Sequence, residues 1–352
     1  MSVSSLEITV SVDAMGGDNA PAVPVLGAIL ACTRIPLLHV ILFGDSEQIE
    51  PLLEDTPEEI RSKISIEHCT EIVSGNDKPS ITIRKGQQSS MNRAIQVVNS
   101  GDCVGVVSAG NTGALMALAL FNLRCLEGIE RPALGRAIPT AKGTTSCILD
   151  LGANLQCSAE HLVQYGMMGA AFAETVIQAK DPVIGLLNIG TEEIKGPATI
   201  RHADSLLQKS HLNYQGFIEG SDLVSGRADV IICDGFSGNI ALKVAEGVFG
   251  MLRNSLKDAF LSTTSSKLGG VLAQGAIKKS FARFDPIKLE GAALLGLKKT
   301  VVKAHGNTTA EGFSNAIKIA LEMGNNHLEA NIATHLERMQ DIPADLYHPP
   351  PS

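Results

Sequence analysis

The stretch Cys103-Val-Gly-Val-Val-Ser-Ala-Gly-Asn-Thr-Gly113 begins with a short apolar run, continues into a glycine-rich polar turn and leads into a helical pattern at 114–123. An apolar run of this length, bounded by turn residues, is typical of a buried parallel strand. The glycines let the backbone approach a ligand, and the helix that follows presents free N–H groups at its start. The stretch therefore predicts a strand–loop–helix unit of an α/β protein.

The same unit recurs along the chain. Further strands are predicted from the apolar runs at 6–12, 37–43, 146–149, 183–187 and 230–233. Helical patterns lie between them, at 22–32, 81–98, 160–178, 198–208, 241–260 and 309–339, the last with a candidate break near Gly324. This alternation predicts a doubly wound, mainly parallel α/β sheet with helices on both faces. We expect one large α/β domain over 1–343, with a helical arm at about 246–283 and a disordered tail at 344–352.

Polar turn residues follow five of the predicted strands, at 13–21, 108–113, 150–154, 188–196 and 234–239. In open parallel sheets, ligands bind beyond the carboxyl ends of the strands. Ordinary turns and helix caps explain any one of these loops. Five loops of the same narrow composition instead predict one convergent polar site.

The amides and polar side chains of these loops suit a phosphate or a developing oxyanion. The candidates for catalysis are Asn111, Lys195, Asn239 and His305. Lys195 offers a counter-charge for phosphate, while for His305 a site role and a turn role are equally favoured. The candidates for substrate or phosphate binding are Asp13, Gly16, Gly17, Asp18, Ser108, Gly110, Thr112, Gly113, Asn154, Asn188, Asp234 and Ser237.

Other chemistry is less favoured. A divalent ion has four possible carboxylate ligands, but we prefer the interpretation that these side chains orient loops; they are Asp13, Asp18, Asp150 and Asp234. Cys147 and Cys157 are better explained as buried thiols than as nucleophiles, and His161 as a polar helix residue than as a base. Neither a dinucleotide nor a P-loop fingerprint is present, and the G-x-S-x-G elbow of serine hydrolases is missing.

Composition narrows the class of protein further. Trp is absent and aromatic residues make up 4%, which argues against single-stranded nucleic acid as a partner. The seven cysteines form no C-x-x-C pair, as expected of reduced thiols in a cytoplasm. No signal peptide is visible and no run of 18 apolar residues occurs, so a membrane span is not expected.

Charge is unevenly distributed. Residues 251–303 carry ten Lys or Arg and three acidic residues, a net charge of +7, whereas the whole chain carries −8. This segment is either a surface for an acidic partner or an anionic membrane, or an ordinary solvated helical face.

In their order along the chain, the loops resemble the PlsX-type phosphate acyltransferases. The resemblance rests on Asp13-Ala-Met-Gly-Gly-Asp-Asn-Ala-Pro21, Ser108-Ala-Gly-Asn-Thr-Gly-Ala-Leu-Met116, Asp150-Leu-Gly-Ala-Asn154, His161-Leu-Val-Gln-Tyr-Gly-Met-Met-Gly169, Asn188-Ile-Gly-Thr-Glu192, Asp234-Gly-Phe-Ser-Gly-Asn239 and Lys303-Ala-His-Gly306. It runs from about Val10 to His327. Two positions depart from the family pattern: Gln156-Cys157 stand where an acidic residue is usual, and Glu290-Gly-Ala-Ala replaces a Gly-Gly-Ala run.

The resemblance implies synthesis of acyl phosphate from acyl carrier protein and inorganic phosphate, for phospholipid assembly. It implies a fold similar to isocitrate and isopropylmalate dehydrogenases and to phosphotransacetylases, in a cytoplasmic homodimer without metal or organic cofactor. Some members contact membranes peripherally, beside the downstream glycerol-phosphate acyltransferase. The basic residues Lys278, Lys279, Arg283, Lys298 and Lys299 are then candidates to contact the carrier protein or a membrane, although a dimer-packing helix pair explains the arm slightly better.

Two other classes remain open. A metal- and NAD-dependent dehydrogenase on the similar fold would need a clustered acidic metal site. A non-catalytic module that binds carrier protein or lipid would keep the basic arm but would have little use for five polar loops.

Overall fold

The computed structural model describes residues 8–74, 77, 82–84, 86–281 and 290–339. The tail predicted at 344–352 and the candidate Arg283 lie outside these residues. Eleven strands form a single sheet in the order β3-β2-β1-β4-β11-β10-β5-β6-β9-β7-β8. The strands are β1 Ile8–Asp13, β2 Leu38–Gly44, β3 Ile64–His68, β4 Gly105–Ser108, β5 Ala133–Pro139, β6 Thr145–Leu149, β7 Ile184–Leu187, β8 Tyr214–Ile218, β9 Val230–Ile232, β10 Ala292–Leu295 and β11 Thr300–Lys303.

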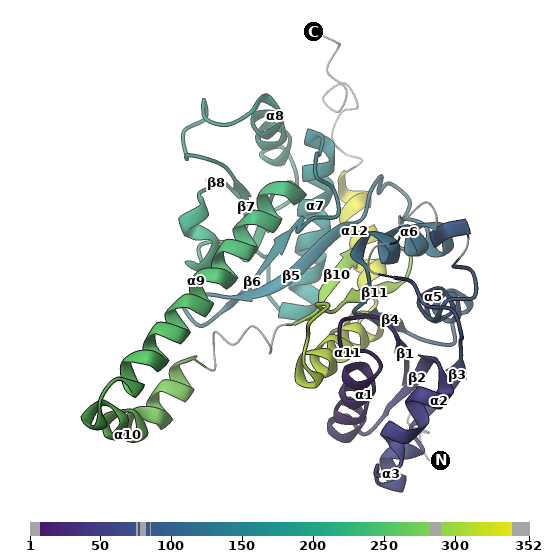
Figure 1. Cartoon of the computed structure of the whole chain (residues 1–352). Helices are drawn as coiled ribbons and strands as arrows, with labels where there is room; N and C mark the ends of the chain where they lie inside the picture. Colours follow the sequence, from purple (N-terminus) through teal and green to yellow (C-terminus); the bar gives the residue numbers. More distant parts are fainter. Residues whose placement is uncertain (1–7, 75–76, 78–81, 85, 282–289, 340–352) are drawn as a thin grey trace, which may run out of the picture.

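Helices cover both faces of this sheet (Figure 1). They are α1 Ala22–Arg34, α2 Ser46–Ile49, α3 Glu58–Arg61, α5 Ser90–Ser100, α6 Thr112–Leu123, α7 Ala159–Phe172, α8 Ala198–Leu207, α9 Gly235–Leu261, α10 Thr264–Phe281, α11 Ala310–Asn325 and α12 Leu328–Met339. One hydrophobic core joins the sheet to α1, α7, α8, α11 and α12. A second core on the opposite face includes α5 and α6. The expected mainly parallel α/β sheet is therefore confirmed.

The two halves of the sheet run in opposite directions. β1, β2, β3, β4 and β11 are parallel to one another, as are β6, β7, β8 and β9. The antiparallel strands β10 and β5 join the two halves. β5 pairs with β10 through its first residues, at Gly135, and with β6 through its later ones, at Arg136. Because the halves are offset along β5, their carboxyl ends meet near the middle of the sheet instead of at opposite edges.

The joining strands are among those that the sequence patterns do not predict. β5 has Gly135, Arg136 and Pro139 within it, so it lacks a continuous apolar run. β10, at Ala292–Leu295, is likewise not among the predicted strands. The helical pattern at 309–339 also proves to be two helices, since the chain turns at Asn326 and His327, which has a positive φ of 50°.

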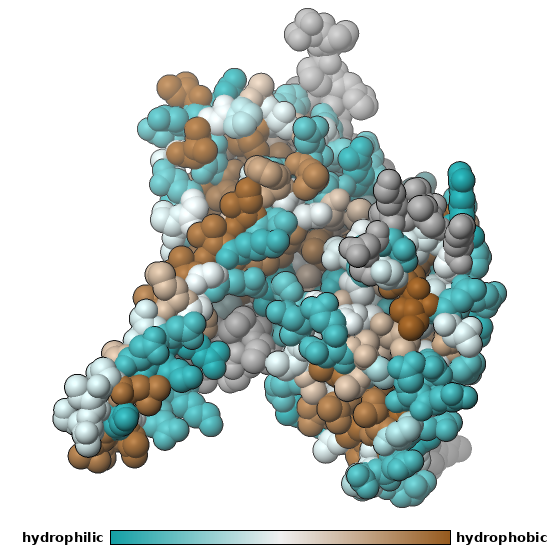
Figure 2. Space-filling view, in the orientation of Figure 1, coloured by the Kyte–Doolittle hydropathy of each residue, from teal (hydrophilic) through white to brown (hydrophobic). Residues whose placement is uncertain are grey.

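α9 and α10 form a helical hairpin that extends away from the rest of the molecule (Figure 1). We call these two helices the arm. α9 is 27 residues long and begins at Gly235, earlier than the boundary expected from sequence. Its exposed side includes Val244, Val248, Met251 and Leu252, and Figure 2 shows apolar residues along it and at the tip of the hairpin. Among the described residues, no helix is long and apolar enough to cross a membrane.

Candidate functional site

A cavity of about 740 Å³ opens where the two halves of the sheet meet. Its walls come from the loops after β1, β4, β6 and β11, from the start of β10 and from the first turns of α9. The polar and glycine residues that line it are Gly17, Asp18, Ser74, Gly110, Asn111, Thr112, Gly113, Arg136, Gly152, Asn239, Lys243, Glu246, Glu290, Gly291, Lys303, His305 and Gly306. Apolar side chains complete the wall, among them Met15, Ile72, Val73, Leu134, Leu151 and Leu242.

Asp13 and Ser108 form the support beneath two of the loops. Ser108 Oγ donates to the Asp13 carboxylate at 2.7 Å and accepts from the Gly110 N–H at 3.0 Å. Ser90 Oγ donates to the other carboxylate oxygen of Asp13, also at 2.7 Å. Both Asp13 and Ser108 are buried, and burial raises the pKa of Asp13 against the opposing effect of these hydrogen bonds. These two side chains shape the cavity without lining it.

The loop after β1 needs glycine because it lies very close to the loop after β4. A Cβ on Gly16 would come within 2.5 Å of the Asp13 carboxylate and 2.7 Å of the Gly110 nitrogen. Gly17 has a φ of +107° and lies against Ala109. The two loops are therefore in contact through glycine, as a backbone-lined site needs.

The start of α6 faces the cavity. Asn111 is its N-cap, and the side-chain oxygen of Asn111 accepts from the Ala114 N–H at 3.1 Å. Thr112 and Gly113, the first residues of the helix, line the cavity. N–H groups at a helix start have no partner within the helix and carry a partial positive charge. This end of α6 thus offers donors for an anion.

Lys303 lies beside the same loop and is 8% exposed. Its Nζ donates to the carbonyl oxygen of Ala109 at 3.2 Å and also to that of Ala304. Burial lowers the pKa of Lys303 to about 8, although Glu290, Asp13 and Asp18 favour its charged form. Sequence analysis did not select Lys303. The signal that could have found it is a Lys at the end of an apolar run, next to His305-Gly306.

Arg136 supplies a second buried cation that sequence analysis missed. Its side chain is 7% exposed and forms an ion pair of 2.8 Å with Glu246 of α9. The pair ties β5 to the base of the arm at the cavity wall. Because β5 was not predicted as a strand, Arg136 had no place in the expected site.

Asp150 organises the loop after β6. Its carboxylate accepts from the N–H groups of Leu134, Gly152, Ala153 and Asn154, at 2.6 to 3.1 Å, and from the Asn154 side chain. Asn154 is buried as well, and its side chain also donates to the carbonyl of Pro132 at 2.8 Å. The loop-orienting interpretation of Asp150 is thereby confirmed.

The start of α9 is largely occupied by its own chain. The Gly235 N–H donates to the carbonyl of Asn154 at 2.9 Å, and Asp234 accepts from both the N–H and the hydroxyl of Ser237. Asp234 and Ser237 do not line the cavity, whereas Asn239, one turn further on, does. Of the two predicted anion-binding helix starts, the one on α6 remains accessible.

Asn188 and Lys195 are not among the described residues that line the cavity. The loop after β7 therefore does not line this cavity, and the roles expected of Asn188 and Lys195 stay predictions. β7 lies two strands beyond β6, so its carboxyl end is displaced outward from the meeting point of the half-sheets. Lys195 is exposed, and its carbonyl accepts from the Asn188 side chain at 3.2 Å.

Cysteine and metal chemistry find little support in the described part of the chain. No cysteine lines the cavity, and burial raises the pKa of both Cys147 and Cys157. No cluster of three His, Cys, Asp or Glu suited to a metal occurs among the described residues.

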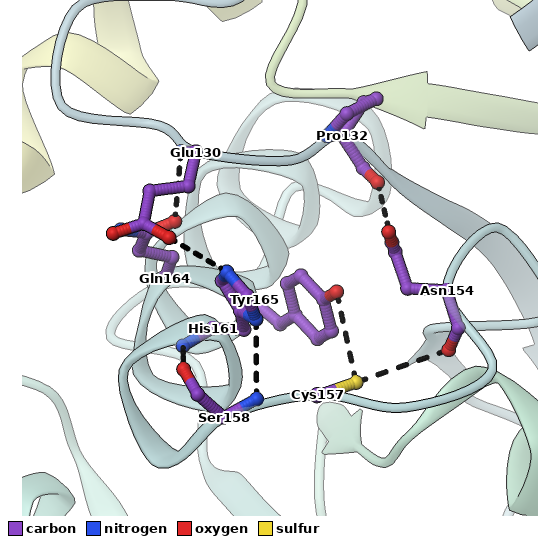
Figure 3. A network of polar contacts seen from close by, with 8 residues as sticks. All are labelled: Glu130, Pro132, Asn154, Cys157, Ser158, His161, Gln164 and Tyr165. Atoms are coloured by element: carbon purple, nitrogen blue, oxygen red, sulfur yellow. Dashed lines mark hydrogen bonds and ion pairs between the residues drawn. The ribbon is translucent and has the colours of Figure 1, made fainter.

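Figure 3 shows the contacts around Cys157 and His161 at the start of α7. His161 forms a capping box with Ser158 and lies 2.8 Å from the Glu130 carboxylate. Cys157 contacts the hydroxyl of Tyr165 at 3.7 Å. His161 therefore stabilises the start of a helix, as expected from sequence.

The candidate contacts for the carrier protein divide between two places. Lys278 and Lys279 are exposed in the last turn of α10, on the arm. Lys298 is exposed and Lys299 half-buried in the turn between β10 and β11.

Comparison with known proteins agrees with this architecture. Residues 8–331 match the family model described as "Fatty acid synthesis protein". The chain is 47% identical to a phosphate acyltransferase of Rhodospirillum centenum, over 94% of this chain and 93% of the relative. It is 44% identical to a phosphate acyltransferase of Paramagnetospirillum magneticum, over 97% of each.

Among solved structures, a phosphotransacetylase from Streptococcus pyogenes superposes with a TM-score of 0.61 at 18% identity, covering 92% of this chain and 99% of that one. This likeness confirms the expected similarity to the phosphotransacetylase fold. The extent of the family match and the identity of the relatives together show that the chain belongs to the phosphate acyltransferase family of fatty acid synthesis proteins and is an acyltransferase.

Proposed function

We propose that this acyltransferase moves a fatty acyl group from the thioester of acyl carrier protein to inorganic phosphate, which yields acyl phosphate for the synthesis of phosphatidic acid. The observation that carries the proposal is the anion site formed by the start of α6 and the buried Lys303, next to apolar cavity walls. Phosphate needs the positive surroundings, the acyl chain needs the apolar walls, and transfer between them needs the two side by side.

The reaction requires positioning more than activation. An oxygen of hydrogen phosphate attacks the thioester carbonyl, a C–O bond forms and the C–S bond breaks, and the proton of the phosphate ends on the carrier thiol. Holding the two reactants in register makes the attack effectively unimolecular. Direct attack is favoured over an acyl-cysteine because no cysteine of the described residues lines the cavity.

The developing oxyanion needs donors at the carbonyl. Asn111 and Asn239 line the cavity from opposite halves of the sheet, so a thioester between them would have a side-chain amide on each side. His305 is exposed at the rim and is placed to protonate the leaving thiolate. Lys195 serves as a further phosphate counter-charge if the loop after β7 moves toward the cavity.

The partners follow from charge and surface. Acyl carrier proteins are acidic, and Lys298 and Lys299, in the turn between β10 and β11, offer them a basic surface at the opposite end of β11 from the cavity. The apolar side of α9 is a surface for a second subunit in a homodimer, and the arm, with Lys278 and Lys279 in the last turn of α10, is a surface for peripheral contact at the inner face of a membrane. There the downstream glycerol-phosphate acyltransferase would receive the product, in a cytoplasmic pathway without nucleic acid, metal or organic cofactor.

The test is phosphate-dependent release of free thiol from palmitoyl-carrier protein, with acyl phosphate trapped by hydroxylamine. We expect thiol release that saturates with phosphate and gives hydroxamate in equal amount. Lys195→Ala is expected to raise the phosphate requirement. Thiol release that is independent of phosphate, or none beside an active control enzyme, would overturn the proposal.

A further inference from the structure

Glu290 is an acidic side chain in a cavity otherwise suited to an anion. It is 8% exposed, lines the cavity next to Gly291, and is one of the positions at which the sequence departs from the family pattern. Its Oε1 is buried and, within the described part of the chain, has no hydrogen-bond partner. A buried carboxylate oxygen without a donor costs free energy, about 1–3 kcal/mol or more. A ligand that brings a donor into the cavity would satisfy this carboxylate.

The Glu290 carboxylate packs against the start of α11. It lies against Gly312 so closely that a Cβ there would collide with Oε2. Gly312 belongs to the first turn of α11, whose partial positive charge favours a carboxylate. The terminal torsion of a Glu side chain is broad, so either oxygen can turn toward the cavity.

Lys303 is the buried cation that lines the same cavity as Glu290. Of the neighbouring charges, Glu290 does most to favour the ammonium form of Lys303. Lys303 donates to backbone carbonyls of the loop that leads to α6. The cavity is thus lined by the Lys303 cation, by the N–H groups at the start of α6 and by the Glu290 carboxylate, a hydrogen-bond acceptor.

Hydrogen phosphate is the anion that matches this arrangement. At neutral pH it carries both P–O⁻ groups, which accept hydrogen bonds, and a P–O–H group, which donates one. Sulfate has the same shape and charge but no proton to donate. A carboxylate acceptor in an anion site therefore favours hydrogen phosphate and repels sulfate.

We propose that Glu290 determines the specificity of this site for hydrogen phosphate by accepting the hydrogen bond of its P–O–H group, while Lys303 and the start of α6 bind its charged oxygens. The inference rests on the proposed use of phosphate as acyl acceptor. It adds that arsenate, which also keeps a proton, binds at the same site and that sulfate is excluded.

The experiment measures equilibrium binding of radiolabelled inorganic phosphate to the full chain, with unlabelled phosphate, arsenate or sulfate as competitor. In the wild-type chain arsenate should compete nearly as well as phosphate, and sulfate at least about 10-fold more weakly. In Glu290→Gln the ratio of sulfate to phosphate affinity should rise about 10- to 100-fold, which corresponds to the loss of one charge-assisted hydrogen bond.

Glu246→Gln is the control for charge, since it also removes one negative charge from the cavity wall, and the Arg136 that it leaves without its ion-pair partner attracts phosphate and sulfate alike. It should change the ratio by less than about threefold. Equal competition by sulfate in the wild-type chain, an unchanged ratio in Glu290→Gln, or an equal shift in Glu246→Gln would each overturn the inference. The wild-type competition keeps the test decisive even if Glu290→Gln fails to fold. Because binding is read without acyl transfer, selective phosphate binding without hydroxamate formation would overturn only the proposed reaction.

Discussion

The Nζ atom of Lys303 donates a hydrogen bond to the carbonyl oxygen of Ala109 at 3.2 Å, which joins the end of β11 to the loop between β4 and α6. β4 and β11 are neighbours in the sheet, with Lys303 paired to Ser108. The cation is therefore fixed by strand register and by the loop that would bind phosphate. Because Lys303 lies beside the proposed phosphate site, a change in its charge should change the rate of acyl transfer.

Activity should fall as pH rises through about 8. Burial lowers the pKa of Lys303 to about 8, so its charge is present below that pH and is lost above it. The profile of kcat/KM for phosphate reports groups of the free enzyme, and we expect its alkaline limb near pH 8. Lys303→Gln should lose roughly 100-fold in kcat/KM, whereas Lys303→Arg should retain more activity and move the limb to higher pH. An alkaline limb unchanged in Lys303→Arg would contradict this assignment.

Asn111 can be tested apart from its capping role. Asn111→Asp keeps an oxygen that accepts from the Ala114 N–H but loses the Nδ2 donor, whereas Asn111→Ala loses both. If Asn111 is an oxyanion donor, both variants should lose roughly 100- to 1000-fold in kcat. Only Asn111→Ala should also lose stability, by about 1 kcal/mol. Full activity in Asn111→Asp would show that the residue acts only as a helix cap.

Asn239 offers a second donor from the other half of the sheet. Asn239→Ala should lower kcat roughly 100-fold or more, with a smaller change in the KM for phosphate, because an oxyanion donor acts mainly in the transition state. Single-turnover rates with palmitoyl-carrier protein measure this difference. An effect confined to KM would instead place Asn239 in substrate binding.

Asp150→Asn should destabilise the fold by about 2–4 kcal/mol. The Asp150 carboxylate accepts from four backbone N–H groups, and an amide cannot replace all of these bonds. Urea unfolding followed by circular dichroism measures the loss. Asp258→Asn, an exposed change on α9, serves as the control and should stay within about 0.5 kcal/mol. Equal stability of the two variants would show that the loop is held by other contacts.

The exposed side of α9 should mediate self-association. Gln in place of Val244, Val248 and Met251 would remove apolar contacts from one face of the helix, and we expect the variant to sediment as a monomer. Lys257→Gln, on the opposite face, should leave the mass unchanged. A dimer in both variants, with loss of vesicle flotation only in the first, would assign this face to the membrane instead.

Local sequence patterns predict several features of the site correctly because they depend on neighbouring residues. The polar glycine-rich loops follow the predicted strands, and His161 lies in a helix as expected; that Asn111 caps α6, that Gly16 and Gly17 let two loops touch and that His161 closes a capping box are findings of the structure. The patterns could not find Arg136, because a short strand containing Gly and Pro has no apolar run. They included Lys303 in a basic segment and in a family motif but did not select it for the site, since its burial depends on strands that come from distant parts of the chain.

The sequence by itself determined the class of fold, the family and the loops that carry polar residues, because apolar periodicity, turn chemistry and ordered motifs are written locally. Only the tertiary structure decided which of those loops meet. Two half-sheets of opposite direction, offset along β5, bring the carboxyl ends of β1, β4 and β6 to one cavity and displace that of β7. Burial lowers the pKa of Lys303 and leaves Glu290 as a buried hydrogen-bond acceptor, because the free energy of a charged or polar group depends on what surrounds it.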